Sequence, residues 1–125
     1  MIRNIKFRAW TKEQKQMVEV VELNFYQATM ASIYGDYASG EREWDLKDFE
    51  NVELMQYVGL KDKNGTEIYE GDVIVWEYNE IPQEVKWDNS IGGYSTKRYH
   101  LWRAINKMEV IGNIYENPEL LQEEK

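Results

Sequence analysis

The sequence contains no cysteine and a single histidine, His100. The absence of cysteine excludes disulfide bonds, cysteine-ligated zinc and thiol catalysis, and it indicates a reducing compartment such as the cytoplasm. One histidine cannot form a two-histidine metal site or a relay between histidines. No segment approaches the ~20 consecutive apolar residues of a membrane-spanning helix, and the amino terminus lacks the apolar run of a signal peptide. We therefore expect a cytoplasmic chain that does not contact a membrane.

Acidic residues are the most prominent feature of the composition. The chain of 125 residues has 23 Asp and Glu against 15 Lys and Arg, for a formal net charge of −8. Such a charge makes the whole chain a poor general binder of nucleic acid. Hydrophobic residues make up 42% of the sequence, which is enough for a folded core. The length predicts one domain, or one domain with a closely attached extension.

The charge is unevenly distributed along the chain. Residues 41–56 hold six acids and two bases, and residues 70–84 hold five acids and no base. Residues 85–108 instead hold five bases and one acid, for a net charge of +4. The acidic average therefore conceals one basic stretch, in which Trp and Tyr residues alternate with Lys and Arg.

Residues 52–76 carry the clearest local pattern. Apolar and polar residues alternate over 52–58, which predicts a half-buried strand. The pair Asn64-Gly65 predicts a hairpin turn with positive φ at both positions. The run then breaks at Gly71 and Asp72, which predicts a structural corner or bulge in which the Asp72 carboxylate accepts backbone hydrogen bonds.

The run after this corner, residues 73–76, is apolar on both faces and predicts a strand buried in a small barrel. We expect Val73 and Val75 to point into that barrel. Further strands are expected at residues 2–10, 17–26, 83–87, 94–105 and 108–115, with a bulge at Gly112. Asn117 and Pro118 predict the start of a short C-terminal helix.

Residues 27–51 are ambiguous. Gly35 and Gly40 bracket a short polar segment, which indicates a loop. The spacing of Trp44 and Phe49 fits neither a helix nor a strand. Two interpretations remain open: a short helical turn over 45–49 capped by Asp45, or a loop held in place by the two aromatic side chains.

Three segments carry a resemblance to a known family: IKFRAW at residues 5–10, MQYVGLKDKNGTEIYEGDVI at 55–74, and EVIGNIYENPELL at 109–121. Together they resemble the YopX family of bacteriophage and prophage proteins over essentially the whole chain, although residues 17–50 match no motif. The resemblance implies a small SH3-type β-barrel (residues 51–125) with an N-terminal β extension and loop (residues 1–50). It implies no particular biochemical activity.

The sequence offers little catalytic chemistry. Glu70 and Asp72 form an acidic pair that could hold a divalent cation or act as acid and base, but the intervening Gly71 explains the same residues as a corner. His100 lies between Tyr99 and Leu101 and is interpreted as a strand residue. There is no phosphate-binding loop and no dinucleotide fingerprint. We therefore expect a protein that is not an enzyme and holds no metal or cofactor.

Binding remains as the general class of function. Candidate partner-binding residues lie in the basic stretch: Tyr94, Lys97, Arg98, Trp102 and Arg103. One hypothesis is a protein-interaction module, self-associating through contact between its acidic and basic stretches and anchored by aromatic residues such as Trp44, Trp102 or Tyr94. The alternative is nucleic-acid binding, in which those aromatic rings stack on bases and the cations contact phosphates. The net charge favours a protein partner over nucleic acid.

Overall fold

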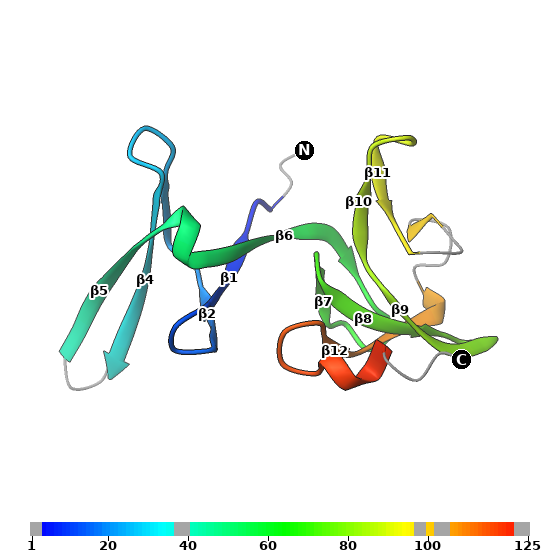
Figure 1. The fold of residues 1–125 in the computed structure, drawn as a ribbon. Helices are drawn as coiled ribbons and strands as arrows, with labels where there is room; N and C mark the ends of the chain where they lie inside the picture. Colours follow the sequence, from blue (N-terminus) through cyan, green and yellow to red (C-terminus); the bar gives the residue numbers. More distant parts are fainter. Residues whose placement is uncertain (1–3, 37–40, 97–99, 102–105, 122–125) are drawn as a thin grey trace. The chain divides into compact units, whose positions relative to one another are not determined.

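More than half of the described residues lie in antiparallel β-strands, as Figure 1 shows for the computed structural model. The structure describes residues 4–36, 41–96, 100–101 and 106–121. The predicted mainly β fold is confirmed, and the predicted C-terminal helix is a short 3-10 turn. The SH3-type arrangement of the barrel stays a prediction.

The chain divides into two units, each with its own packed interior. The N-terminal unit is Lys6–Gln56, and the C-terminal unit is Tyr57–Lys125 together with Met1–Ile5. The boundary therefore falls inside strand β6 (Val52–Lys61), a few residues beyond the boundary expected after residue 50.

The N-terminal unit contains two sheets. Its strands are β1 (Phe7–Thr11), β2 (Gln16–Glu19), β3 (Glu22–Asn24), β4 (Thr29–Asp36), β5 (Glu41–Asp48) and the first part of β6, with a 3-10 turn η1 (Phe49–Asn51) before β6. One sheet includes β2–β1–β6 and the other has the order β3–β4–β5. The predicted strand over residues 17–26 is interrupted at Val20-Val21, so β2 pairs with β1 as expected while β3 pairs with β4.

A small apolar core holds the N-terminal unit together. Ala9, Met30 and Val52 are buried, and half-buried side chains pack against them: Val18, Val20, Leu23, Phe49 and Leu54. Each of the two sheets contributes residues to this core, so the two sheets form a single folded unit.

Both interpretations of residues 45–49 are wrong for most of that segment. Residues 41–48 form the strand β5, which pairs with β4 in a regular hairpin from Asp36↔Glu41 to Thr29↔Asp48. Only Phe49–Asn51 form a helical turn, and Asp48 rather than Asp45 occupies its cap position without a side-chain capping bond. The spacing of Trp44 and Phe49 was uninformative because the two residues belong to different elements.

The C-terminal unit is built from the remaining strands: the end of β6, β7 (Glu67–Tyr69), β8 (Asp72–Trp76), β9 (Asn79–Glu84), β10 (Lys86–Asp88), β11 (Gly93–Ser95) and β12 (Met108–Asn113), followed by the 3-10 turn η3 (Pro118–Leu121). The central sheet has the order β12–β8–β9, while β10 and β11 form a separate hairpin. Among the described residues of this unit, the buried core cluster comprises Ile68, Ile74, Trp76, Val85, Leu101 and Met108.

The inward face of β8 differs in part from the prediction. Val73 is fully buried as expected, but Val75 is only half-buried, and Ile74 and Trp76 supply the core contacts. A strand that is apolar on both faces gives no periodic signal, so its sequence could not identify the face that enters the core.

The turn after β6 is held by a buried carboxylate. Asp62 is 5% exposed, and its Oδ1 accepts hydrogen bonds from the N–H groups of Asn64 (2.8 Å) and Thr66 (2.9 Å). Its Oδ2 accepts a third, from the N–H of Val110 on β12 (2.9 Å). Burial raises the pKa of Asp62, but the three backbone donors and nearby Lys63 outweigh burial, so the pKa lies below its usual value.

The Asn64-Gly65 turn is only partly as predicted. Gly65 has φ of 84°, and its N–H donates to the carbonyl of Asp62 (3.0 Å). Among the described non-glycine residues, positive φ occurs only at Lys15 and Ala28, so the expectation for Asn64 is wrong. The loop has three residues between Asp62 and Thr66, a length at which the last residue, here Gly65, takes the left-handed conformation.

Gly71 and Asp72 form the corner that leads into β8. Gly71 has φ of 85°, and its carbonyl accepts a hydrogen bond from the N–H of Ile114 (2.9 Å). Asp72 is 2% exposed, and its Oδ2 accepts from the N–H of Tyr69 (2.8 Å). The carboxylate of Asp72 therefore closes the turn between β7 and β8.

Gly112 lies at a register shift of β12 against β8, where a bulge was expected. A Cβ atom at this position would approach Oδ1 of Asn117 to 2.5 Å and Cδ1 of Leu120 to 2.8 Å. Asn117 directs that oxygen back to the N–H of Asn113 (3.2 Å). Glycine is thus the residue that lets the C-terminal turn pack closely on β12.

Candidate functional site

The structure describes one of the five candidate partner-binding residues. Tyr94, on β11, is half-buried and packs against the core of the C-terminal unit, with its ring 5.1 Å from that of Trp87 in an edge-to-face arrangement. Lys97, Arg98, Trp102 and Arg103 lie outside the described residues. Tyr94 therefore has a structural role in the core, and the basic loop itself has no described geometry.

Each described lysine of the basic stretch lies close to an acidic or aromatic side chain. Lys86 lies 3.9 Å from a carboxylate oxygen of Glu84, and the Nζ of Lys107 lies 5.3 Å from the centre of the Tyr78 ring, which is within cation–π range. Trp87 is 49% exposed, so one aromatic ring of this stretch faces solvent.

The acidic residues do not gather into a metal site. Within the described residues, no group of three or more His, Asp or Glu side chains could hold a metal ion. The carboxylate of Asp72 accepts a hydrogen bond from the Tyr69 N–H. His100 forms an isolated β-bridge with Ser95. Asp88 accepts from the Ser90 hydroxyl (2.7 Å) and N–H (2.9 Å), which lowers the pKa of Asp88.

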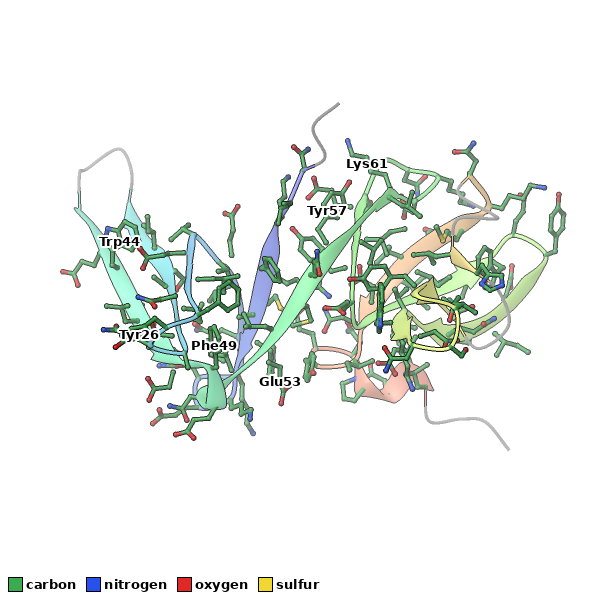
Figure 2. The ribbon with its side chains drawn as sticks, turned by 90° about the horizontal axis from the view of Figure 1, so that it is seen from above. Tyr26, Trp44, Phe49, Glu53, Tyr57 and Lys61 are labelled. Carbon is green, nitrogen blue, oxygen red and sulfur yellow. The ribbon has the colours of Figure 1, made fainter. Side chains whose placement is uncertain are left out.

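An exposed apolar strip lies on the β4–β5 hairpin of the N-terminal unit. Trp44 and Leu46 on β5 are 57% and 63% exposed, and they share one face because they are two residues apart in a strand. Their cross-strand neighbours on β4 are Ile33 and Ala31. Figure 2 shows Trp44 among the side chains of this hairpin. Large apolar side chains on an open sheet face are typical of a binding surface.

On the opposite face of β5, charged side chains point towards the packed side of the sheet. Asp45 and Lys47 are only partly exposed, and the Lys47 Nζ lies 3.4 Å from the Asp45 carboxylate. The amphipathic pattern of β5 is therefore inverted: apolar residues face solvent while an ion pair faces the sheet's packed side.

β5 is also the edge of its sheet, since no other described strand pairs with it beyond β4 (Figure 1). The N–H of Phe49 donates to the carbonyl of Ala28 (2.8 Å), and the carbonyl of Ala31 accepts from Val21 on the far side of β4 (2.9 Å). Because backbone groups alternate in direction along an antiparallel strand, these bonds direct the N–H and C=O of Trp44 and Leu46 away from β4. The exposed residues thus also present outward-facing backbone groups.

A hollow of about 220 Å³ opens beside the C-terminal half of β5. It is lined by Glu13, Gln14, Leu46, Lys47, Asp48 and Asn51. Two acids and one base line it, so the hollow favours a cationic group over an anionic one.

A second exposed apolar site lies at the tip of the β3–β4 hairpin. Phe25 is 76% and Tyr26 96% exposed, and Tyr26 is labelled in Figure 2. The Phe25 ring lies 6.1 Å from that of Phe49. The two residues lie in the turn between β3 and β4, where Ala28 has φ of 57°. This tip adds aromatic surface to the N-terminal unit.

The sequence identified Trp44 as a candidate anchor residue, but the strand β5 that carries Trp44 was not predicted. The alternation Glu43-Trp44-Asp45-Leu46-Lys47 has the period of a strand and could have predicted β5. Asp62 was also missed. The signal was available in part, because an Asp two residues before Asn64-Gly65 commonly accepts backbone hydrogen bonds in turns.

These features define a small all-β protein whose exposed apolar surface lies on an edge strand and whose described residues show no convergent catalytic group. The chain belongs to the YopX family, since the model of the YopX protein family matches residues 6–122. A crystal structure of protein EF1440 from Enterococcus faecalis is similar, with 29% sequence identity and a TM-score of 0.71 over 97% of this chain and 100% of that chain. No curated protein matches the sequence. No helix of the described residues is long and apolar enough to cross a membrane.

Proposed function

We propose that this protein acts by binding another protein, including further copies of itself, and that it carries no catalytic activity. The observation that carries the proposal is the β5 strand, on which Trp44 and Leu46 are both more than half exposed and lie along an open sheet edge. Burying large apolar side chains drives protein association, and aromatic residues dominate the affinity of many interfaces.

The charge around this strand supports a partner with basic groups. The segment 41–56, which contains β5, holds six acids and two bases. Complementary charge steers association and selects the partner, while the apolar side chains supply affinity. We place this activity in the cytoplasm of a bacterial host cell that carries a phage or prophage, in keeping with the family resemblance.

The alternative is nucleic-acid binding through the stretch 85–108. It is supported by Trp87, whose half-exposed ring could stack on a base beside the cations of that stretch. Against it stands the net charge of −8, which repels a polyanion at long range.

Substitution of Trp44 in the N-terminal unit or of Trp87 in the C-terminal unit distinguishes protein binding from nucleic-acid binding. Tagged and untagged copies are co-expressed in the bacterial host, and the tagged copy is captured with and without nuclease treatment. We expect the untagged copy to be retained after nuclease, Trp44→Ser to reduce its retention several-fold, and Trp87→Ser to leave it unchanged. The two side chains are similarly exposed, at 57% and 49%, so each variant controls for the other.

The opposite pattern would contradict the proposal. If only nucleic acid were retained, and its retention were lost in Trp87→Ser but kept in Trp44→Ser, the nucleic-acid function would replace it.

A further inference from the structure

We propose that two copies of the chain pair edge to edge through β5, antiparallel, with the two Asp45 residues opposite each other on a two-fold axis. The inference rests on the proposed function and names its partner, a second copy of this chain. The contact is isologous, unlike the head-to-tail contact between acidic and basic stretches considered from the sequence.

The backbone restricts the possible registers. As shown above, the N–H and C=O groups of Trp44 and Leu46 point away from β4, and those of Asp45 point towards it. In an antiparallel pair, outward-facing residues must be opposite outward-facing residues. The two-fold axis can therefore pass through Trp44, Asp45 or Leu46, but not between two neighbouring residues.

Charge and strand length together select one of these three registers. With the axis at Asp45, the register places Glu43 opposite Lys47 on both sides of the axis, so opposite charges meet twice. With the axis at Trp44, Glu43 would be opposite Asp45, which brings like charges together twice. With the axis at Leu46, only residues 44–48 of β5 could pair within the strand, so fewer hydrogen bonds would form.

The same register joins the apolar strips. Trp44 of each copy is opposite Leu46 of the other, and these residues lie on one face of the combined sheet. Two Trp44 and two Leu46 side chains, each more than half exposed in one copy, would therefore form one continuous apolar strip across the axis.

The only like-charge contact in this register is already compensated. The two Asp45 carboxylates meet at the axis, but each has the Nζ of its own Lys47 at 3.4 Å. Charges on an edge strand generally prevent pairing, whereas here their order allows this pairing and disfavours the neighbouring register at Trp44.

The natural absence of cysteine makes cross-linking a direct test. In Asp45→Cys, the two introduced thiols would lie opposite each other with Cα atoms about 4.5 Å apart, which a disulfide can bridge. In Glu43→Cys or Lys47→Cys alone, the two thiols would be four residues apart along the strands, about 13 Å, which a disulfide cannot bridge. A mixture of these two variants would again place a cysteine opposite a cysteine.

Purified variants are oxidised mildly, and covalent dimer is measured on non-reducing gels, with Glu77→Cys as a control for random collision because Glu77 is exposed on the C-terminal unit. We expect at least tenfold more dimer for Asp45→Cys than for Glu43→Cys, Lys47→Cys or the control. We also expect the Glu43→Cys and Lys47→Cys mixture to cross-link far better than either alone. The mixture keeps the test decisive if Asp45→Cys folds poorly.

Two results would overturn the pairing. If neither Asp45→Cys nor the mixture exceeds the control, β5 does not pair, and if Glu43→Cys alone cross-links as well as Asp45→Cys, the register is wrong. Sedimentation of the wild type separates this failure from failure of the proposed function. A wild-type dimer without these cross-links refutes only the β5 pairing, whereas a monomer that captures no protein refutes both.

Discussion

Replacing Asp62 by alanine should lower the free energy of unfolding by about 3 kcal/mol, because three partly buried hydrogen bonds to a charged acceptor are lost at once. Two of those donors, Asn64 and Thr66, belong to the turn itself, and the third, Val110, lies on β12. The carboxylate therefore joins the β6–β7 turn to β12. Urea denaturation followed by tryptophan fluorescence measures the change.

Asp88 provides a matched control. It also accepts hydrogen bonds at the start of a hairpin turn, but they come from the N–H and the hydroxyl of Ser90, two residues away. Asp88→Ala should leave the denaturant midpoint nearly unchanged, since its donors can turn to water. Equal losses for the two variants would contradict the role of Asp62 in joining distant elements.

The low pKa of Asp62 makes its contribution dependent on pH. The folded-state pKa lies below the unfolded value, so the stabilisation is fully present above the unfolded pKa and is lost as the pH falls through the folded pKa. The difference in stability between wild type and Asp62→Asn should thus be constant near neutrality and shrink below about pH 4. A difference that grows on acidification would contradict this assignment.

Replacing Ile74 by alanine should lower the free energy of unfolding by about 2–5 kcal/mol, through lost burial and a residual cavity. Ile74 is fully buried in the core of the C-terminal unit, between the neighbouring strands β12 and β9. Val75→Ala, one position along the same strand, should cost only about 1 kcal/mol, since Val75 is half-buried. Denaturant midpoints for both variants, measured side by side, test which face of β8 enters the core.

A reversal of this order would show that the face is misassigned. If Val75→Ala were the more damaging substitution, the original expectation that Val73 and Val75 point inward would be restored. Far-ultraviolet circular dichroism on each variant confirms that the fold is retained before the midpoints are compared.

Local sequence patterns predicted the strands that show apolar alternation and the turns that are marked by glycine. Alternation identified β1 and β6, and Gly65 and Gly71 marked turns that need positive φ. A glycine inside a strand pattern likewise predicted the bulge at Gly112, where the close approach of Asn117 leaves no room for a Cβ atom. In each case the signal lies within a few residues of the feature that it predicts.

β5 was missed because the spacing of Trp44 and Phe49 was measured across two different elements, although residues 43–47 alternate with the period of a strand. The alternation does not tell which face of the strand is buried. In the structure, Trp44 and Leu46 face solvent, while Asp45 and Lys47 are paired on the more buried face.

The role of Asp62 and the inward face of β8 depend on tertiary structure. Val110 donates to Asp62 from 48 residues away, a relation that no local pattern contains. Ile74 and Val75 are both apolar and β-branched, so only the positions of β12 and β9 decide which of them is buried.

Sedimentation velocity of the untagged wild type tests most directly whether the protein acts by binding protein, itself included. It is carried out over a range of concentrations at low salt, beside a titration of single-stranded DNA followed by fluorescence anisotropy. We predict that the protein passes from monomer to dimer or larger species as its concentration rises, and that it binds DNA weakly or not at all. A protein that stays monomeric and binds DNA with an affinity that falls steeply with salt would contradict the account.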